Sequence, residues 1–140
     1  MPLKTTKNYS PNFNSIKRRA KEIKFIILHY TGMKKESEAI DKLTNIQSEV
    51  SSHYLIKKSG EIIKMVPDLY IAWHAGKSSW KKYRSLNKNS IGIEITNPGH
   101  ELNYEKFSKK QISSLIKLSK ILIKKYKISY KNILGHSDIA

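Results

Sequence analysis

Residues 23–30 read Ile-Lys-Phe-Ile-Ile-Leu-His-Tyr, and Thr31-Gly32 follow directly. An apolar run of this length, with Phe and three Ile, is typical of a strand buried on both faces of a sheet. Gly32 marks the turn that ends it. Side chains at the end of such a strand project into the crevice over the sheet edge, where α/β folds place functional groups. His29 is therefore the first candidate functional residue.

Outward from this strand, hydrophobic periodicity and turn residues predict two helices and four more strands. The helices are expected at Lys35–Ser48 and at Ser108–Tyr126, where Ser108 and Gln111 form a capping box. The strands are expected at His53–Lys58 and Glu61–Val66, joined as a hairpin by Ser59-Gly60, and at Ser90–Thr96 and Asn132–Gly135. The pattern indicates a single α/β domain with a central mixed sheet flanked by helices. Residues 1–22 are expected to form an N-terminal arm laid over a domain of residues 23–140.

Five histidines are candidates for chemistry: His29, His53, His74, His100 and His136. His29 and His136 share a context, because each lies at the C-terminal end of a predicted strand. A neutral imidazole in that position is a good zinc ligand. The alternative is that each is an ordinary half-buried histidine bonded to the backbone. No local metal-binding spacing such as HExxH decides between them.

Glu94 lies in Ser-Ile-Gly-Ile-Glu-Ile-Thr, within what should be a central strand. Ile91, Ile93 and Ile95 are expected on one face and Glu94 on the other. Burial of a carboxylate is costly, and it raises the pKa toward the range in which the group exchanges a proton with bound water. The alternative is a partly solvated position with a lysine nearby.

Aromatic side chains gather in the loop-rich stretch that follows Pro67. Trp73, His74 and Trp80 could line a ligand groove, although tryptophans also often seal the edge of a small core.

Composition bounds the remaining possibilities. The 140 residues carry a formal net charge of +16, which by itself suggests an anionic partner such as nucleic acid. Only Arg18, Arg19 and Arg84 are arginines, however, and arginine is the usual reader of bases and phosphates, so we expect no nucleic-acid partner. The absence of cysteine excludes thiolate metal sites. No apolar run is long enough to span a membrane, and the N-terminus has no apolar segment typical of a secretory signal, so a cytoplasmic location is expected.

Five blocks of sequence occur in an order and at spacings that together form a specific pattern. They are Ile27-Leu28-His29-Tyr30-Thr31-Gly32, Val50-Ser51-Ser52-His53-Tyr54-Leu55-Ile56, Ala72-Trp73-His74-Ala75-Gly76, Leu86-Asn87 with Ser90-Ile91-Gly92-Ile93-Glu94, and Gly135-His136-Ser137-Asp138-Ile139-Ala140. From about Ser10 to Ala140 the chain resembles the zinc-dependent N-acetylmuramoyl-L-alanine amidases of the AmpD-like branch. These enzymes share their fold, amidase type 2, with T7-type lysozymes and peptidoglycan recognition proteins.

The resemblance implies a role for each matching position. His29 and His136 match two Zn²⁺ ligands, and Glu94 matches the carboxylate that activates water. Trp73 and His74 match a loop beside the substrate cleft, and His53 matches a structural histidine. The implied reaction is hydrolysis of the amide between the muramoyl or anhydro-muramoyl sugar and L-alanine of the stem peptide. The implied partners are peptidoglycan fragments, or muropeptides, as in cell wall recycling.

The family pattern continues with a Pro-x-Arg-Lys-x-Asp-Pro-Gly segment that supplies the third zinc ligand and a catalytic lysine. Both positions are expected beyond Ala140, and Asp138 belongs to a different motif position. The alternatives are therefore a truncated amidase or a form that binds peptidoglycan without cleaving it. A basic nucleic-acid-binding protein is a third, less favoured alternative.

Overall fold

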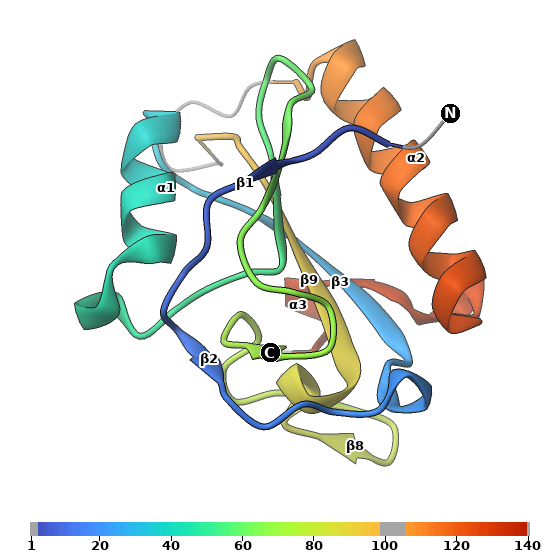
Figure 1. The fold of residues 1–140 in the computed structure, drawn as a ribbon. Helices are drawn as coiled ribbons and strands as arrows, with labels where there is room; N and C mark the ends of the chain where they lie inside the picture. The colour runs from blue at the N-terminus through green and yellow to red at the C-terminus, as the bar shows by residue number, and fades with distance from the viewer. Residues whose placement is uncertain (1–2, 99–105, 140) are drawn as a thin grey trace.

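The main sheet of the computed structural model runs through the centre of the molecule, with helices on both sides (Figure 1). The structure describes residues 3–98 and 106–139. In spatial order the six strands are β1 (Thr6–Lys7), β5 (Ile62–Lys64), β4 (Tyr54–Ile56), β9 (Ser90–Ile95), β3 (Phe25–Tyr30) and β10 (Ile133–Gly135). β4 and β5 pair antiparallel, and the other four neighbouring pairs are parallel. The predicted mixed sheet is confirmed.

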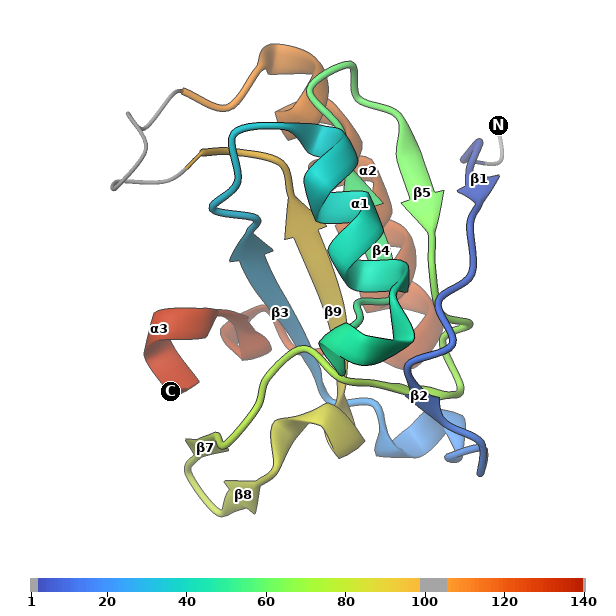
Figure 2. The same cartoon turned by 90° about the vertical axis from the view of Figure 1, so that its left-hand side faces the viewer.

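The two long helices, α1 (Glu36–Thr44) and α2 (Lys109–Tyr126), cover opposite faces of this sheet (Figure 2). Alternation along β4 explains the division. Leu55 packs in a cluster with residues of α1, whereas its neighbours Tyr54 and Ile56 pack in the cluster that contains residues of α2. The sheet is therefore buried on both faces, as its apolar strands predict.

The first helix is shorter than its periodicity predicts. Asn45 takes an extended backbone conformation (φ −90°, ψ 123°), so α1 ends at Thr44. The Asn45 side chain then accepts a hydrogen bond from Gln47 N–H at 2.9 Å and starts a separate 3-10 turn, η2 (Ile46–Ser48). A polar side chain bonded to its own backbone thus divides the predicted helix.

The second helix begins as predicted. Ser108 Oγ accepts a hydrogen bond from Gln111 N–H at 3.0 Å, and Gln111 Oε1 accepts one from Ser108 N–H at 3.0 Å. This reciprocal pair is the capping box. The helix ends at Tyr126, and the left-handed conformation of the next residue, Lys127 (φ 54°), lets its N–H bond to the carbonyl of Ile123.

The hairpin of β4 and β5 is also present, with strands shorter than predicted. Gly60 lies in its turn at φ +88°, and a Cβ there would lie 3.0 Å from the Lys110 carbonyl oxygen of α2. Both the conformation and the close approach require glycine. The turn is therefore fixed to the start of α2.

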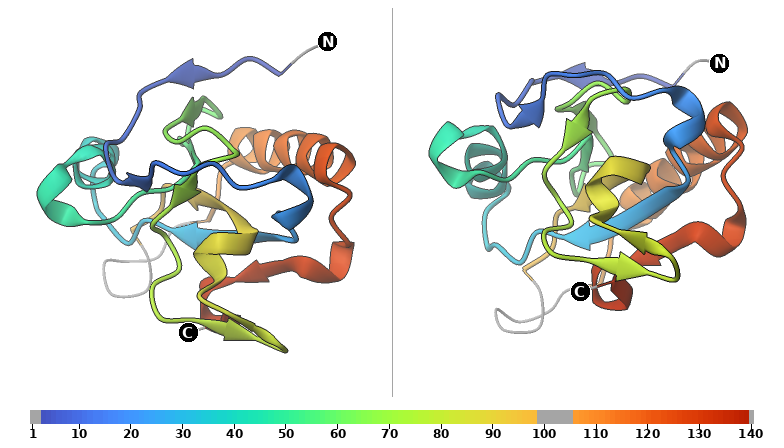
Figure 3. Two further views of the ribbon diagram at one scale, coloured as in Figure 1. Left: turned by 60° about the horizontal axis from the view of Figure 1, so that its bottom comes forward. Right: turned by 90° about the horizontal axis from the view of Figure 1, so that it is seen from below.

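Several short elements were not predicted, because two to four residues carry no readable periodicity. They are β1, the ribbon of β2 (Phe13–Asn14) and β6 (Ile71–Ala72), the ribbon of β7 (Ser79–Trp80) and β8 (Tyr83–Arg84), the 3-10 turns η1 (Ala20–Glu22), η3 (Leu86–Asn89) and η5 (Tyr130–Asn132), and α3 (His136–Ile139). Trp80 of β7 and Ile139 of α3 pack in one hydrophobic cluster, and the two elements lie side by side (Figure 3).

The N-terminal residues are tied to the rest of the domain at three points. β1 pairs with β5, β2 pairs with β6, and Arg18 is buried, only 5% exposed. The Arg18 guanidinium donates to the carbonyl oxygens of Asp68, Asn87 and Lys88. No helix of the described ranges, 3–98 and 106–139, is long and apolar enough to cross a membrane.

Candidate functional site

Three parallel strands of the sheet, β9, β3 and β10, end at the same edge. In the register of β3 and β9, His29 lies directly opposite Glu94, so the two side chains share a face. In the register of β3 and β10, Gly135 lies opposite Leu28, so His136 follows beside His29. The sheet therefore brings together the three residues that the sequence singles out for metal binding and proton transfer.

The two histidines meet through their Nδ1 atoms, which are 3.0 Å apart. Two nitrogens bound to one tetrahedral zinc at 2.0–2.1 Å lie about 3.4 Å apart, so the pair fits two positions of a zinc shell with only a small adjustment. Within residues 3–98 and 106–139, no three His, Asp or Glu side chains converge as a ligand set. Asp138 is turned to the backbone, where its Oδ2 accepts from Gly135 N–H at 2.9 Å. The described residues thus bring together two candidate ligands, His29 and His136.

The environment of His29 favours the form that binds metals. Burial, with a smaller contribution from the neighbouring His136, lowers the pKa of His29 to about 3. The ring is therefore neutral at neutral pH, with one lone pair available for a ligand. An open cavity of about 560 Å³ adjoins the pair and is lined by both histidines and by Glu94.

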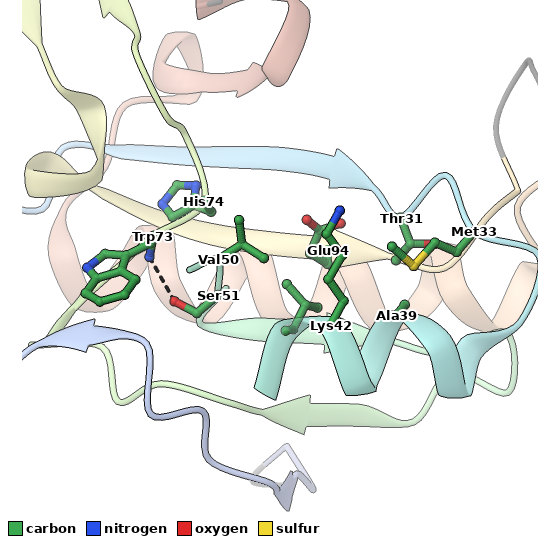
Figure 4. A pocket seen from close by; sticks show the side chains of 10 residues that line it. Thr31, Met33, Ala39, Lys42, Val50, Ser51, Trp73, His74 and Glu94 are labelled. Carbon is green, nitrogen blue, oxygen red and sulfur yellow. Dashed lines mark hydrogen bonds between the residues drawn. The ribbon is translucent and has the colours of Figure 1, made fainter. Parts of the chain in front are cut away.

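The surroundings of Glu94 favour the protonated form of its carboxyl group. Its Oε2 atom is buried, and no hydrogen-bond partner for it exists in the described part of the chain. Loss of hydration raises the pKa of Glu94 to about 8, and the positive charge of Lys42 counteracts part of this effect. Figure 4 shows Lys42 reaching from α1 toward the carboxylate. A carboxyl group with a pKa near neutrality is suited to accept a proton and release it again.

Trp73 and His74 line one end of a smaller cavity, of about 110 Å³, that Glu94 also lines (Figure 4). Their backbone is held from two sides. Trp73 N–H donates to Ser51 Oγ at 2.8 Å, and Asn87 Oδ1 accepts from the N–H groups of His74 and Ala75. The Trp73 indole N–H donates to Asn14 Oδ1 at 2.7 Å. The loop is thus a fixed wall of the cavity.

The remaining aromatic and histidine candidates lie elsewhere. Trp80 packs against the cluster that contains Phe25, so it seals the core edge. His53 is fully buried, and it links β9 to the loop before β6 by accepting from Gly92 N–H at 3.0 Å and bonding to the Tyr70 carbonyl at 2.8 Å. His100 lies outside the described residues, as does Ala140 at the end of the last motif.

Two residues near the site were not singled out from the sequence. Lys42 lies on α1 among charged residues, and its approach to Glu94 depends on how α1 packs on the sheet. Ser90 begins β9, and its Oγ lies 3.0 Å from His74 Nε2. A usable signal existed for Ser90 alone, because a small polar residue precedes Gly92 on the same strand face.

The chain has relatives of known activity. A family model described as N-acetylmuramoyl-L-alanine amidase matches residues 19–140. The N-acetylmuramoyl-L-alanine amidase AmiD of Escherichia coli K12 is 38% identical over 130 residues, which cover 84% of this chain and 46% of AmiD. The chain spans about half the length of the curated relatives it matches.

Solved structures agree with the sequence comparison. The complex of E. coli AmiD with the substrate anhydro-N-acetylmuramic acid-L-Ala-D-γ-Glu-L-Lys superposes with a TM-score of 0.76 at 36% identity, over 84% of this chain and 49% of that chain. A selenomethionine derivative of AmpD superposes with a TM-score of 0.81 at 26% identity, over 100% of this chain and 85% of that one. In fold and in sequence, the chain belongs to the N-acetylmuramoyl-L-alanine amidase family.

Proposed function

We propose that this protein hydrolyses the amide bond between the muramoyl or anhydro-muramoyl sugar and L-alanine of the stem peptide. Residues 23–140 would form the amidase domain and residues 1–22 an arm packed on it. The observation that carries the proposal is the meeting of His29 and His136 through Nδ1 atoms 3.0 Å apart, with Glu94 opposite His29 on the next strand. The cytoplasmic location stays a prediction.

His29 and His136 would hold a zinc ion between them. Zinc bound there supplies a Lewis acid that activates water and polarises the amide carbonyl. A third ligand would come from a residue outside the described ranges, as the family resemblance implies.

Glu94 would move the proton. Its carboxylate accepts a proton from the attacking water, the water oxygen bonds to the amide carbon, and the C–N bond breaks. The same carboxyl group then delivers the proton to the departing amine of L-alanine, so a carboxylic acid and a free amine are formed. Among the described residues, no hydrogen bond to Oε2 competes with this exchange.

The cavity wall formed by Trp73 would contact the substrate. The cavity continues from Glu94 along the face of the sheet that α1 covers, so a muropeptide bound at the metal would extend beside Trp73.

The test uses the longest form of the protein that its gene encodes, loaded with zinc. The substrate is N-acetylmuramoyl-L-Ala-D-γ-Glu-L-Lys or its anhydro form, and mass spectrometry detects the released peptide. Glu94→Gln should lower turnover by about 10²- to 10⁴-fold while zinc content stays at the wild-type level. The exposed Glu38→Gln on α1 is the matched control and should keep full activity. His29→Ala should lose the zinc.

Turnover retained by Glu94→Gln would refute the role of Glu94, and binding of peptidoglycan without any released peptide would refute the amidase activity.

A further inference from the structure

A chain of hydrogen bonds extends from the far side of the His29 ring, away from His136. His29 Nε2 lies 3.0 Å from His74 Nδ1, and His74 Nε2 lies 3.0 Å from Ser90 Oγ. The Ser90 hydroxyl in turn donates to the Leu86 carbonyl oxygen at 2.7 Å. This series of hydrogen bonds therefore ends on a carbonyl oxygen, which can only accept a hydrogen bond.

The Leu86 carbonyl fixes which group donates and which accepts in each hydrogen bond of this series. Because the Ser90 hydroxyl donates to Leu86, its oxygen must accept from His74 Nε2–H. A neutral imidazole carries one N–H and one lone pair, so His74 Nδ1 is an acceptor and His29 Nε2–H is the donor. The remaining lone pair of His29 is then on Nδ1, the atom that faces His136.

The position of the His74 ring depends on the absence of a side chain at Gly92. A Cβ at Gly92 would lie 2.5 Å from His74 Cγ, which is closer than any real contact. Ser90 and Gly92 lie on β9 on the same face as Glu94, so one strand supplies the acceptor, the space for the ring and the carboxylate. Asn87 also holds the His74 backbone, because its Oδ1 atom accepts a hydrogen bond from His74 N–H at 3.1 Å.

We propose that His74 and Ser90 are positioning residues that hold His29 in its Nε2–H tautomer and so present Nδ1 to the metal shared with His136. This inference rests on the proposed function. Histidine ligands of metals commonly donate their second N–H to an outer partner that orients the ring, and loss of such a partner weakens metal binding about 10- to 100-fold. Here that partner is a second histidine. Both nitrogens of His74 are engaged, so it acts through His29 and not on the substrate.

The first test reads the tautomer directly in the metal-free protein. Long-range ¹H–¹⁵N correlation spectra at neutral pH distinguish the two neutral tautomers of each histidine. The wild type should show His29 protonated on Nε2. Ser90→Ala removes the acceptor of His74 but leaves the ring in place, so His29 should become a mixture of both tautomers. A wild-type His29 spectrum in Ser90→Ala would overturn the proposal.

The second test measures zinc affinity by competition with a chelator. His74→Leu removes the acceptor and should weaken zinc binding about 10- to 100-fold. His74→Asn places an amide oxygen near the position of Nδ1 and should restore binding to within several-fold of wild type. Urea unfolding of each variant shows whether a loss of zinc affinity comes from misfolding. Wild-type zinc affinity in folded His74→Leu would also overturn the proposal. Neither readout requires turnover, so a protein without amidase activity would leave both results interpretable.

Discussion

Replacement of Glu94 by glutamine should change how the stability of the metal-free protein depends on pH. Burial raises the pKa of Glu94 from its ordinary value of 4.5 to about 8. Between these two pH values the folded protein keeps a proton that the unfolded chain has released. The folded state therefore binds more protons in this window, and the free energy of unfolding must fall as the pH rises through it.

The size of the effect follows from the width of the window. At about 1.4 kcal/mol for each pH unit, the interval from 4.5 to about 8 corresponds to at most about 5 kcal/mol. We expect about 3 to 5 kcal/mol, because Glu94 is partly exposed and solvent screens part of the effect. Glu94→Gln remains uncharged at every pH and should lack this loss.

The assay is equilibrium unfolding in urea, followed by tryptophan fluorescence in the presence of EDTA at pH 5, 6, 7, 8 and 9. The quantity to compare is the difference between variant and wild type. His29 and His53 have pKa values of about 3 in the folded protein but take up protons below about pH 6.5 in the unfolded chain, so they change the stability of both proteins alike. Glu94→Gln should gain stability relative to wild type steadily from pH 5 to pH 8. Glu38→Gln, whose side chain is exposed, should parallel the wild type. Parallel curves for Glu94→Gln and wild type would refute the inference that its carboxyl group is desolvated.

Two further substitutions test hydrogen bonds outside the candidate site. The buried Tyr54 hydroxyl donates to Asp68 Oδ1 at 2.6 Å. Tyr54→Phe should therefore lower the free energy of unfolding, measured in urea, by about 1 to 3 kcal/mol. An unchanged free energy of unfolding would mean that water replaces the hydroxyl. Ser108 caps α2 and also donates to the Lys58 carbonyl at 2.6 Å, so Ser108→Ala should cost about 1 kcal/mol and lower helicity measured by circular dichroism, whereas an unchanged helix signal and midpoint would contradict the capping role.

The elements predicted well are those whose signals lie within the element itself. The capping box of Ser108 and Gln111 has both partners three residues apart, and Gly60 is required by its own backbone conformation. The alternation along residues 90–95 predicts which side chains face α2. The first helix was predicted too long because Asn45 forms a local hydrogen bond that ends it, a choice that periodicity does not reveal.

The candidate site was only partly predictable. The end positions of two strands singled out His29 and His136, and an acidic residue in an apolar strand singled out Glu94. The approach of Lys42 to Glu94 had no comparable signal, because it joins elements that lie far apart in the sequence.

The sequence by itself determined that this chain forms strands and helices around a buried mixed sheet, and which residues end those strands. Local hydrophobic patterns are sufficient for this, because they report which side of each element is buried. Only the tertiary structure decided that β10 lies beside β3, so that His136 meets His29 across 107 positions of sequence. Strand order depends on the long-range packing of whole faces, so the two histidines come together only when those faces have assembled.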